Sequence, residues 1–185
     1  FRCLSFILLF ASTSLLSYSQ DTISVKNIPT KKYAKYLDFR FENGAMLSND
    51  SEVGDQLVNS SYYNGIDFRL GFRKTNPNDV YSNVYRRPYL GVGWYLSTFQ
   101  NSDVGNPHAV YFFMTMPIKF EQAKKFTFSY TGAFGISYKF NPFDSIQNPA
   151  NIFIGSYRNC YVHLGFVGNY KFSEKWQLNG TIGFK

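Results

Sequence analysis

The chain has 185 residues, a length typical of one domain rather than of a multidomain enzyme. Aromatic residues make up 20% of the chain and charged residues 17%, with 20 Phe and 15 Tyr. This aromatic content excludes a disordered chain, and no run reaches the ~18 to 20 apolar residues of a membrane-spanning helix. The composition therefore leaves a soluble β domain or a membrane β-barrel.

The first 20 residues have the pattern of a secretory signal peptide. Arg2 precedes an apolar stretch at residues 6–11, and small residues follow at Ser17 and Ser19, as signal peptidase requires. Since the first residue is Phe and not Met, we expect residues 1–20 to be an N-terminally incomplete signal peptide.

The remaining residues, 21–185, are expected to form the mature domain. Loss of Arg2 with the leader leaves 18 basic residues against 12 acidic ones, a net charge of +6. Loss of Cys3 leaves Cys160 alone, and a single cysteine cannot form an internal disulfide. The exported protein must then be held together in another way, and the closed hydrogen-bond network of a β-barrel is one.

Large apolar side chains alternate with small or polar ones along seven segments, and a period of two predicts strands rather than helices. In chain order these segments are residues 37–42, 66–73, 90–96, 110–120, 126–140, 160–167 and 176–185. Each predicted strand has one oily face and one small or polar face. Because single-chain bacterial barrels have an even number of strands, we expect eight in the full protein and a chain that is truncated at its C-terminus.

The polar faces distinguish a membrane barrel from a soluble sandwich, because a sandwich buries its large side chains whereas a membrane barrel turns them toward lipid. Glycines such as Gly91 and Gly135 on these faces would weaken a sandwich without gain. The charged residues on the same faces are predicted to form a structural network in a narrow lumen: Asp38, Arg40, Glu42, Asp67, Arg69 and Arg73. The pattern favours an all-β, antiparallel transmembrane barrel, with a soluble β domain as the alternative.

Two features of the fourth predicted strand depart from this pattern. Pro117 lies within the strand, and the bulky Phe113 has the parity of the lumen. A bulge near Pro117 is expected to accommodate both.

Loop lengths predict the orientation of the barrel, since short turns face the periplasm and long loops the outside. The connections at residues 121–125 and 173–175 are short, whereas those at residues 44–64, 100–107 and 141–151 are longer and polar. This scheme brings Lys185 close to the outer leaflet. The stretch 74–87 is too long for a periplasmic turn, and the sequence offers no account of it.

The chain shows little catalytic chemistry. His163 is expected on the lumen face, where a polar lumen residue is a simpler interpretation than a general base. Residues 91–93 lack the third glycine of a dinucleotide fingerprint, and Cys160 has the parity of an inert, lipid-facing thiol. Ser156, His163 and Asp144 could be written as a triad, but their spacing does not support one. With no metal-ligand spacing either, the sequence predicts no catalytic residue, metal or cofactor.

Three motifs in a fixed order resemble a known family. They are residues 87–93 (RPYLGVG), residues 105–107 (GNP) leading into 112–117 (FFMTMP), and residues 148–151 (NPAN) followed by 154–156 (IGS). Over about residues 36–185 the chain resembles the acyloxyacyl hydrolase family of outer-membrane lipid A deacylases, the lipid A 3-O-deacylase type. In that family a His-x-Ser-Asn motif follows a strand of the form Leu-x-x-x-x-Gly-Phe. Residues 178–184 match this strand pattern, and the chain ends at Lys185 before the motif.

The resemblance implies hydrolysis of an acyl ester of lipid A by a Ser nucleophile, a His base, an orienting carboxylate and an Asn oxyanion donor. All would lie beyond Lys185, so residues 1–185 alone are expected to be inactive. It further implies the bacterial outer membrane as location and lipid A, or lipopolysaccharide, and membrane lipid as partners, with no nucleic acid and no cofactor. A net charge of +6 suits a phosphate-bearing substrate.

The competing hypothesis is a non-catalytic small outer-membrane barrel with a structural, adhesive or lipid-binding role. Composition and periodicity support it equally well, because a fold does not fix a function. A passive porin is disfavoured, since about eight strands leave no aqueous channel.

Overall fold

The computed structural model describes residues 12–15, 33–45, 63–76, 78–118, 125–149, 151, 154–173 and 175–185. Within these residues the fold is all-β apart from one short helix. Its elements are β1 (Ser12–Leu15), β2 (Tyr33–Gly44), β3 (Tyr63–Lys74), α2 (Val80–Val84), β4 (Tyr89–Thr98), β5 (Gly105–Pro117), β6 (Phe126–Phe140), β7 (Arg158–Lys171) and β8 (Gln177–Phe184). The seven predicted strands correspond to β2 to β8, which confirms the all-β class.

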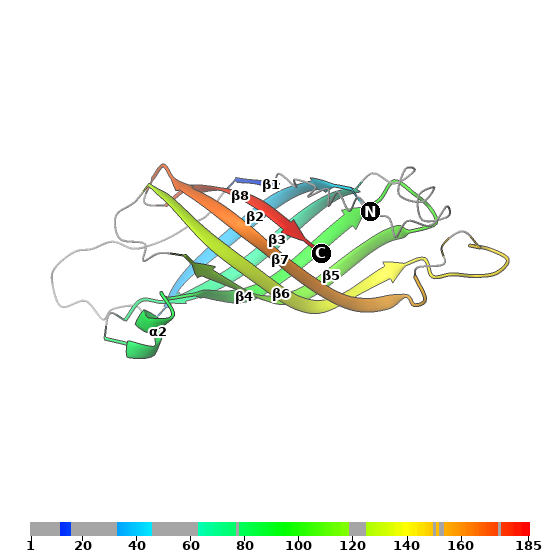
Figure 1. The fold of residues 1–185 in the computed structure, drawn as a ribbon. Coiled ribbons are helices and arrows are strands. Elements are labelled where there is room, and N and C mark those ends of the chain that lie inside the picture. Colours follow the sequence, from blue (N-terminus) through cyan, green and yellow to red (C-terminus); the bar gives the residue numbers. More distant parts are fainter. Residues whose placement is uncertain are drawn as a thin grey trace, which may run out of the picture.

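Strands β2 to β8 pair in chain order, each antiparallel to the next, and form one curled sheet (Figure 1). The short β1 lies between the two edges of this sheet and closes the strand order into a barrel. Thr13 of β1 pairs with Phe41 of β2 on one side and with Gly180 of β8 on the other. Because β1 is antiparallel to both, β2 and β8 run parallel to each other, one strand apart. With only four residues in β1, this seam has the shortest ladders of the barrel.

Strand β1 falls within the segment predicted to be a signal peptide, residues 1–20. The rest of that segment lies outside the described residues, and the signal peptide stays a prediction.

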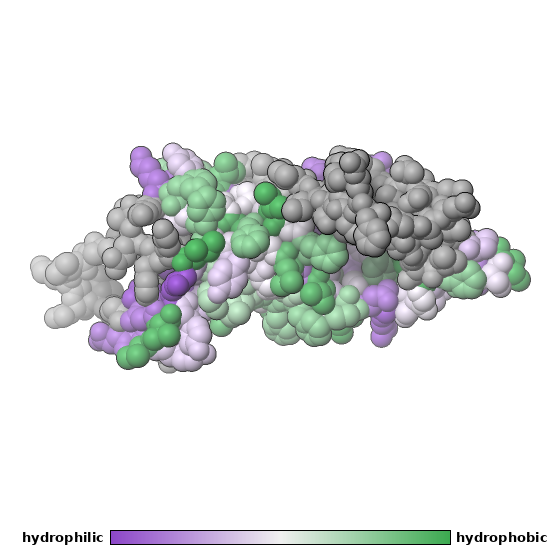
Figure 2. All heavy atoms as spheres, in the orientation of Figure 1, coloured by the Kyte–Doolittle hydropathy of each residue, from purple (hydrophilic) through white to green (hydrophobic). Residues whose placement is uncertain are grey.

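Side chains alternate between the inside and the outside of the barrel along each strand. On β5, Tyr111 and Phe113 are 1% and 3% exposed, whereas Phe112 between them is 73% exposed. The same alternation places the large apolar residues of the other strands outside, and Figure 2 shows hydrophobic side chains over the central part of the strands. The predicted direction of the two faces is therefore confirmed.

Tyrosine rings fill much of the interior, and glycines on neighbouring strands make room for them. A Cβ atom added to Gly65 would overlap the ring of Tyr95, and one added to Gly93 would overlap the ring of Tyr111. The rings of Tyr111 and Tyr161 stack with their centroids 4.9 Å apart. The prediction of a lumen filled by small residues and charges was thus incomplete. The inward glycines make room for aromatic rings, which fill part of the lumen.

In the part of β5 that the structure describes, no bulge lies near Pro117. Pairing between β5 and β6 is continuous from His108 to Pro117, and the register shift lies at the other end of β5, between Gly105 and His108. Pro117 is the last residue of its strand, so its missing N–H interrupts no ladder. Phe113 points inward without a bulge, with its ring 6.3 Å from that of Tyr36. Phe120, predicted to end the strand, lies outside the described residues.

The unexplained stretch 74–87 contains helix α2. Asp79 caps the helix, its carboxylate accepting a hydrogen bond from the Ser82 N–H at 3.0 Å and pairing with Lys74 Nζ at 3.0 Å. Beyond the helix, the Arg86 guanidinium donates to the carbonyls of Pro117 and Ile118 at the end of β5. Helix α2 and the residues that follow it are therefore fastened to the rim of the barrel.

Candidate functional site

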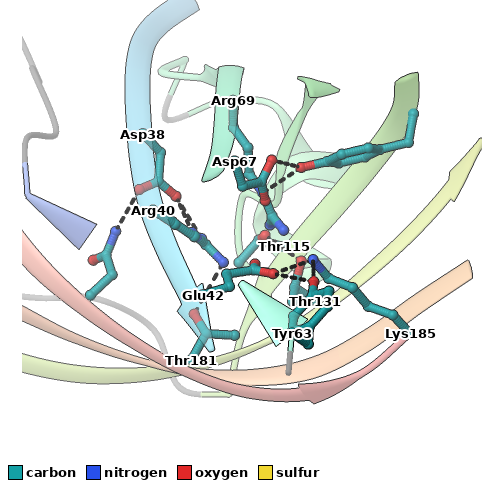
Figure 3. Close-up of polar contacts among 12 residues, drawn as sticks. Asp38, Arg40, Glu42, Tyr63, Asp67, Arg69, Thr115, Thr131, Thr181 and Lys185 are labelled. Atoms are coloured by element: carbon teal, nitrogen blue, oxygen red, sulfur yellow. Dashed lines mark hydrogen bonds and ion pairs between the residues drawn. The ribbon is translucent and has the colours of Figure 1, made fainter. Parts of the chain in front are cut away.

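Four charged side chains from β2 and β3 form the centre of the interior (Figure 3). Asp38 lies opposite Arg69 in the strand register, and Arg40 lies opposite Asp67. Opposite charges therefore alternate both along each strand and across the pair. Arg40 Nη2 is 2.6 Å from Asp38 Oδ2, and Arg69 Nε is 2.8 Å from Asp67 Oδ2, with all four side chains at most 4% exposed. Each guanidinium thus neutralises the carboxylate two residues away on its own strand.

Tyr111 on β5 extends this network across the barrel. Its hydroxyl accepts a hydrogen bond from Arg69 Nε at 2.8 Å and donates one to Asp67 Oδ1. The Arg69 guanidinium carbon lies 5.4 Å from the ring centre of Tyr111 and 5.2 Å from that of Phe113. The guanidinium Nη1 and Nη2 have no hydrogen-bond partner among the described residues, and these aromatic faces provide cation–π contacts in its place.

A second cluster surrounds Glu42, near the end of β2 that leads into the long 45–62 connection. Its carboxylate forms an ion pair with Lys185 and accepts a hydrogen bond from the Tyr63 hydroxyl at 3.2 Å. Lys185 Nζ also lies 3.4 Å from the ring centre of Tyr95. The Lys185 side chain is only 20% exposed, so it points into the barrel. This lysine was not among the predicted residues of the charge network, although it has the inward parity of β8.

Side chains of β8 also reach across the position of β1 to β2. Asn179 Nδ2 lies 3.5 Å from Asp38 Oδ1, and Arg40 Nη1 donates to Thr181 Oγ1 at 3.0 Å. Together with the ion pair between Glu42 and Lys185, these contacts follow one another in chain order along both β2 and the C-terminal residues from β8 onward, as expected for parallel strands. They hold together the seam, where β1 supplies few backbone hydrogen bonds.

The interior charges balance one another. Among the described residues of the network, three carboxylates face three cations: Asp38, Glu42 and Asp67 against Arg40, Arg69 and Lys185. A carboxylate engaged by a cation and by hydrogen bonds is a poor general base, so this arrangement suits a structural role better than a catalytic one.

Arg73, the remaining residue of the predicted network, lies apart from the others. It is half-buried near the α2 end of the barrel, and its Nη1 donates to the Tyr89 hydroxyl at 2.7 Å. The structure thus brings five of the six predicted residues into the interior clusters.

The space left inside the barrel near Asp38 is small. A cavity of about 20 Å³ is lined by residues that include Tyr36, Thr115, Asn169 and Asn179. Such a volume holds about one water molecule. Side chains therefore close the barrel at this level.

The residues considered for a catalytic triad do not come together. His163 lies on β7 with its side chain buried in the barrel, and neither of its ring nitrogens has a hydrogen-bond partner among the described residues. Asp144 and Ser156 lie exposed in the connection between β6 and β7. The Asp144 carboxylate accepts hydrogen bonds from the N–H groups of Gln147 and Ile146, which lower its pKa. No hydrogen bond in the described part of the chain links the three residues.

Two other predicted positions are also non-catalytic in their surroundings. Cys160 is exposed on the outer side of β7, as its parity predicted. Gly91 belongs to β4, and a Cβ added there would meet the backbone of Gly71 and the ring of Phe113. This glycine therefore serves the packing of neighbouring strands.

The motif residues Asn148 and Asn151 join two loops into one unit. The Asn148 amide donates to the Asp103 carbonyl at 2.9 Å, and the Asn151 amide donates to the same carbonyl at 2.6 Å and to that of Asn141 at 2.7 Å. The Asn141 amide in turn donates to the carbonyl of Ser102 at 2.6 Å. These motif residues therefore fasten the β4–β5 and β6–β7 connections together, which is a scaffold role.

The outer face of β2 to β5 is apolar and shallowly hollowed. A groove of about 820 Å³ runs over it, lined mainly by outward side chains such as Leu37, Phe39, Phe68, Trp94 and Trp176. The aromatic and aliphatic side chains of this groove are suited to hydrocarbon contact. Asp38 and Arg69 also border the groove, but their side chains are buried in the ion pairs of the interior.

Within the described residues, no helix has the length and apolar character needed to cross a membrane. The same part of the chain holds no group of three His, Cys, Asp or Glu side chains placed to bind a metal ion. Comparison with known proteins found no matching family model, no matching curated protein and no matching solved structure. The resemblance to lipid A deacylases thus depends on the sequence motifs alone and stays a prediction.

Proposed function

We propose that the protein is a small outer-membrane β-barrel whose outer face contacts lipid and whose interior is closed by paired charges. The observation that carries this proposal is the inverted distribution of side chains. Large apolar residues lie exposed on every long strand, whereas Asp38, Arg40, Asp67 and Arg69 are buried. A protein in water gains free energy from the opposite arrangement, and lipid is the solvent in which this one is stable.

Strand lengths support the same proposal. A membrane-spanning β-strand needs roughly 9 to 11 residues, and strands β2 to β7 have between 10 and 15. Strands β3 to β7 pair with a neighbour on both sides, as backbone groups in hydrocarbon require, whereas β2 and β8 share only the short β1 at the seam. The small interior cavity favours a structural or lipid-binding role over diffusion of solutes through the barrel.

Insertion into vesicles tests this proposal. Urea-unfolded protein diluted into phospholipid vesicles should float with them after an alkaline wash, while a dye trapped in the vesicles is retained because the barrel is closed. Protein that folds without lipid and stays in the aqueous fraction would exclude a membrane barrel. Rapid loss of the dye would exclude the closed interior.

A lipid A ester hydrolase is the second candidate, favoured by the order of the motifs at residues 87–93, 105–107 and 148–151. Inside the described residues these motifs build packing and loop contacts and supply no nucleophile. Mass spectrometry of lipid A from cells that express the full-length protein tests the hydrolase. Loss of one acyl chain supports it, and an unchanged profile with confirmed insertion leaves the non-catalytic barrel.

A further inference from the structure

Helix α2 leaves its apolar side uncovered at the rim of the barrel. Val80, Tyr81, Val84 and Tyr85 are 75%, 69%, 68% and 43% exposed. With successive helical residues turned by about 100°, these four side chains occupy an arc of about 140°. Ser82, on the opposite side, is buried. The helix is therefore amphipathic, with its apolar arc directed away from the protein.

This exposure occurs on a helix that is fixed at both ends. Asp79 caps the first turn and pairs with Lys74, and Arg86 donates to the carbonyls at the end of β5. The rings of Tyr81 and Tyr85 pack together, 4.6 Å between centroids. The apolar arc is thus a preformed surface.

Basic residues flank the apolar arc. Lys74 precedes α2 and pairs with Asp79, and Arg86 and Arg87 follow the helix with no carboxylate of the same connection left to balance them. At the lower left of Figure 2, where Figure 1 places α2, hydrophobic and hydrophilic residues lie side by side. An apolar arc bordered by cations is the arrangement that seats a helix at a lipid–water interface.

The surface of α2 also continues the outer face of the barrel. The helix connects β3 to β4, whose nearest outward side chains, Phe72 and Leu90, are exposed. In a barrel that crosses the membrane along these strands, α2 lies where the hydrocarbon meets the phosphate layer.

We propose that α2 is an interfacial anchor that binds the surface of an anionic phospholipid bilayer. Its valines and tyrosines insert among the parts of the acyl chains nearest the headgroups, and the side chains of Arg86 and Arg87 lie near the lipid phosphates. The anchor fixes the depth of the barrel in the leaflet on the side of the short turns. This inference depends on the proposed function, because only a membrane-inserted barrel brings α2 to that layer.

Site-specific fluorescence in vesicles tests the anchor. The full chain carries Cys3→Ser and Cys160→Ser, and a single labelled cysteine replaces Val84, Asn78 or Phe134 in turn. The vesicles contain phosphatidylcholine alone or with phosphatidylglycerol, and nitroxide quenchers sit either near the glycerol or near the methyl end of the acyl chains. Asn78 is the matched control, a polar exposed position on the same connection.

The label at position 84 should be quenched several-fold more by the shallow nitroxide than by aqueous iodide, and more so in the anionic vesicles. The label at position 78 should show the reverse preference, and the label at position 134 should be quenched by the deep nitroxide. If position 84 is as open to iodide as position 78 while position 134 stays in hydrocarbon, the anchor is excluded and the barrel survives. If position 134 escapes the lipid quenchers, the membrane barrel itself is excluded. Equal quenching at position 84 in both vesicle types would remove the preference for anionic lipid.

Discussion

The two faces of β2 follow opposite rules. On the inner face Asp38 and Arg40 are each 3% exposed, whereas on the outer face Leu37 and Phe41 are 59% and 46% exposed. These residues are neighbours on one strand, and their side chains point to opposite faces of it. The comparison teaches that the environment of each face selects its residues: the interior requires complete pairing of charge, and the exterior requires an apolar surface.

The largest expected effect comes from breaking the pairing inside. Arg69→Met leaves the Asp67 carboxylate buried without its cation, and loss of one partner of a buried ion pair costs about 3–5 kcal/mol. The free energy of unfolding, measured by urea titration in detergent micelles, should fall by that amount. The double variant Asp67→Leu with Arg69→Met is the control, and it should recover much of the loss. Equal destabilisation in both variants would show that packing and not pairing dominates.

A charge on the outer face should have the next largest effect. Phe134 is well exposed in the middle of β6, and Phe134→Arg should cost about 2–4 kcal/mol in a bilayer, because a cation at mid-depth is poorly solvated. Ile146, exposed in the loop after β6, is the matched control, and Ile146→Arg should change stability by less than about 0.5 kcal/mol. Equal tolerance at the two positions would contradict a lipid-facing β6.

The glycine contacts inside the barrel predict a smaller effect. Gly93→Ala places a methyl group against the ring of Tyr111 and should destabilise the barrel by about 1–3 kcal/mol through overpacking. Gly180→Ala is the control, since an added Cβ there meets no described atom within 4 Å. Thermal unfolding of the two variants, followed by the loss of heat-modifiable mobility in gels, distinguishes them. A stable Gly93→Ala would mean that the Tyr111 ring moves aside at little cost.

Loss of the α2 cap in acid is the smallest of the expected changes. The backbone N–H of Ser82, together with Lys74, lowers the pKa of Asp79 to about 2. Because this pKa is lower than in the unfolded chain, the stabilising contribution is complete above about pH 4 and is lost as the pH falls through about 2. The protection factor of the Ser82 amide, taken against its intrinsic exchange rate at each pH, should therefore stay constant in mild acid and fall near pH 2. In Asp79→Asn the exchange should lose this pH dependence, and an unchanged profile would exclude the carboxylate as the cause.

The sequence predicted the strands and their two faces because each depends on residues two apart. The predicted interior charges share a parity on each strand, Asp38, Arg40 and Glu42 on one and Asp67 and Arg69 on the next, and this can be identified without knowing which strands are neighbours. The contact of Gly93 with Tyr111 was not predictable in the same way, because it depends on the register between β4 and β5. Helix α2, with its cap, was missed because a helix of five residues is too short to show a helical period of apolar residues.

Contacts across the seam were harder still to predict. Pairing of Glu42 with Lys185 joins the second strand to the last, and no local pattern marks such a pair. The interaction of Asn148 and Asn151 with the Asp103 carbonyl likewise requires two loops to meet. Their motifs were visible in the sequence, but their structural role depended on the fold.

The direction of the two faces can be measured most directly by a nitroxide scan along β6 in phospholipid vesicles, from position 129 to position 136. The account predicts that collision with oxygen, which concentrates in hydrocarbon, is high at positions 130, 134 and 136, and that positions 129, 131, 133 and 135 are shielded both from oxygen and from a water-soluble nickel chelate. Accessibility of the even positions to the nickel chelate, or the absence of a period of two, would contradict the lipid-facing barrel.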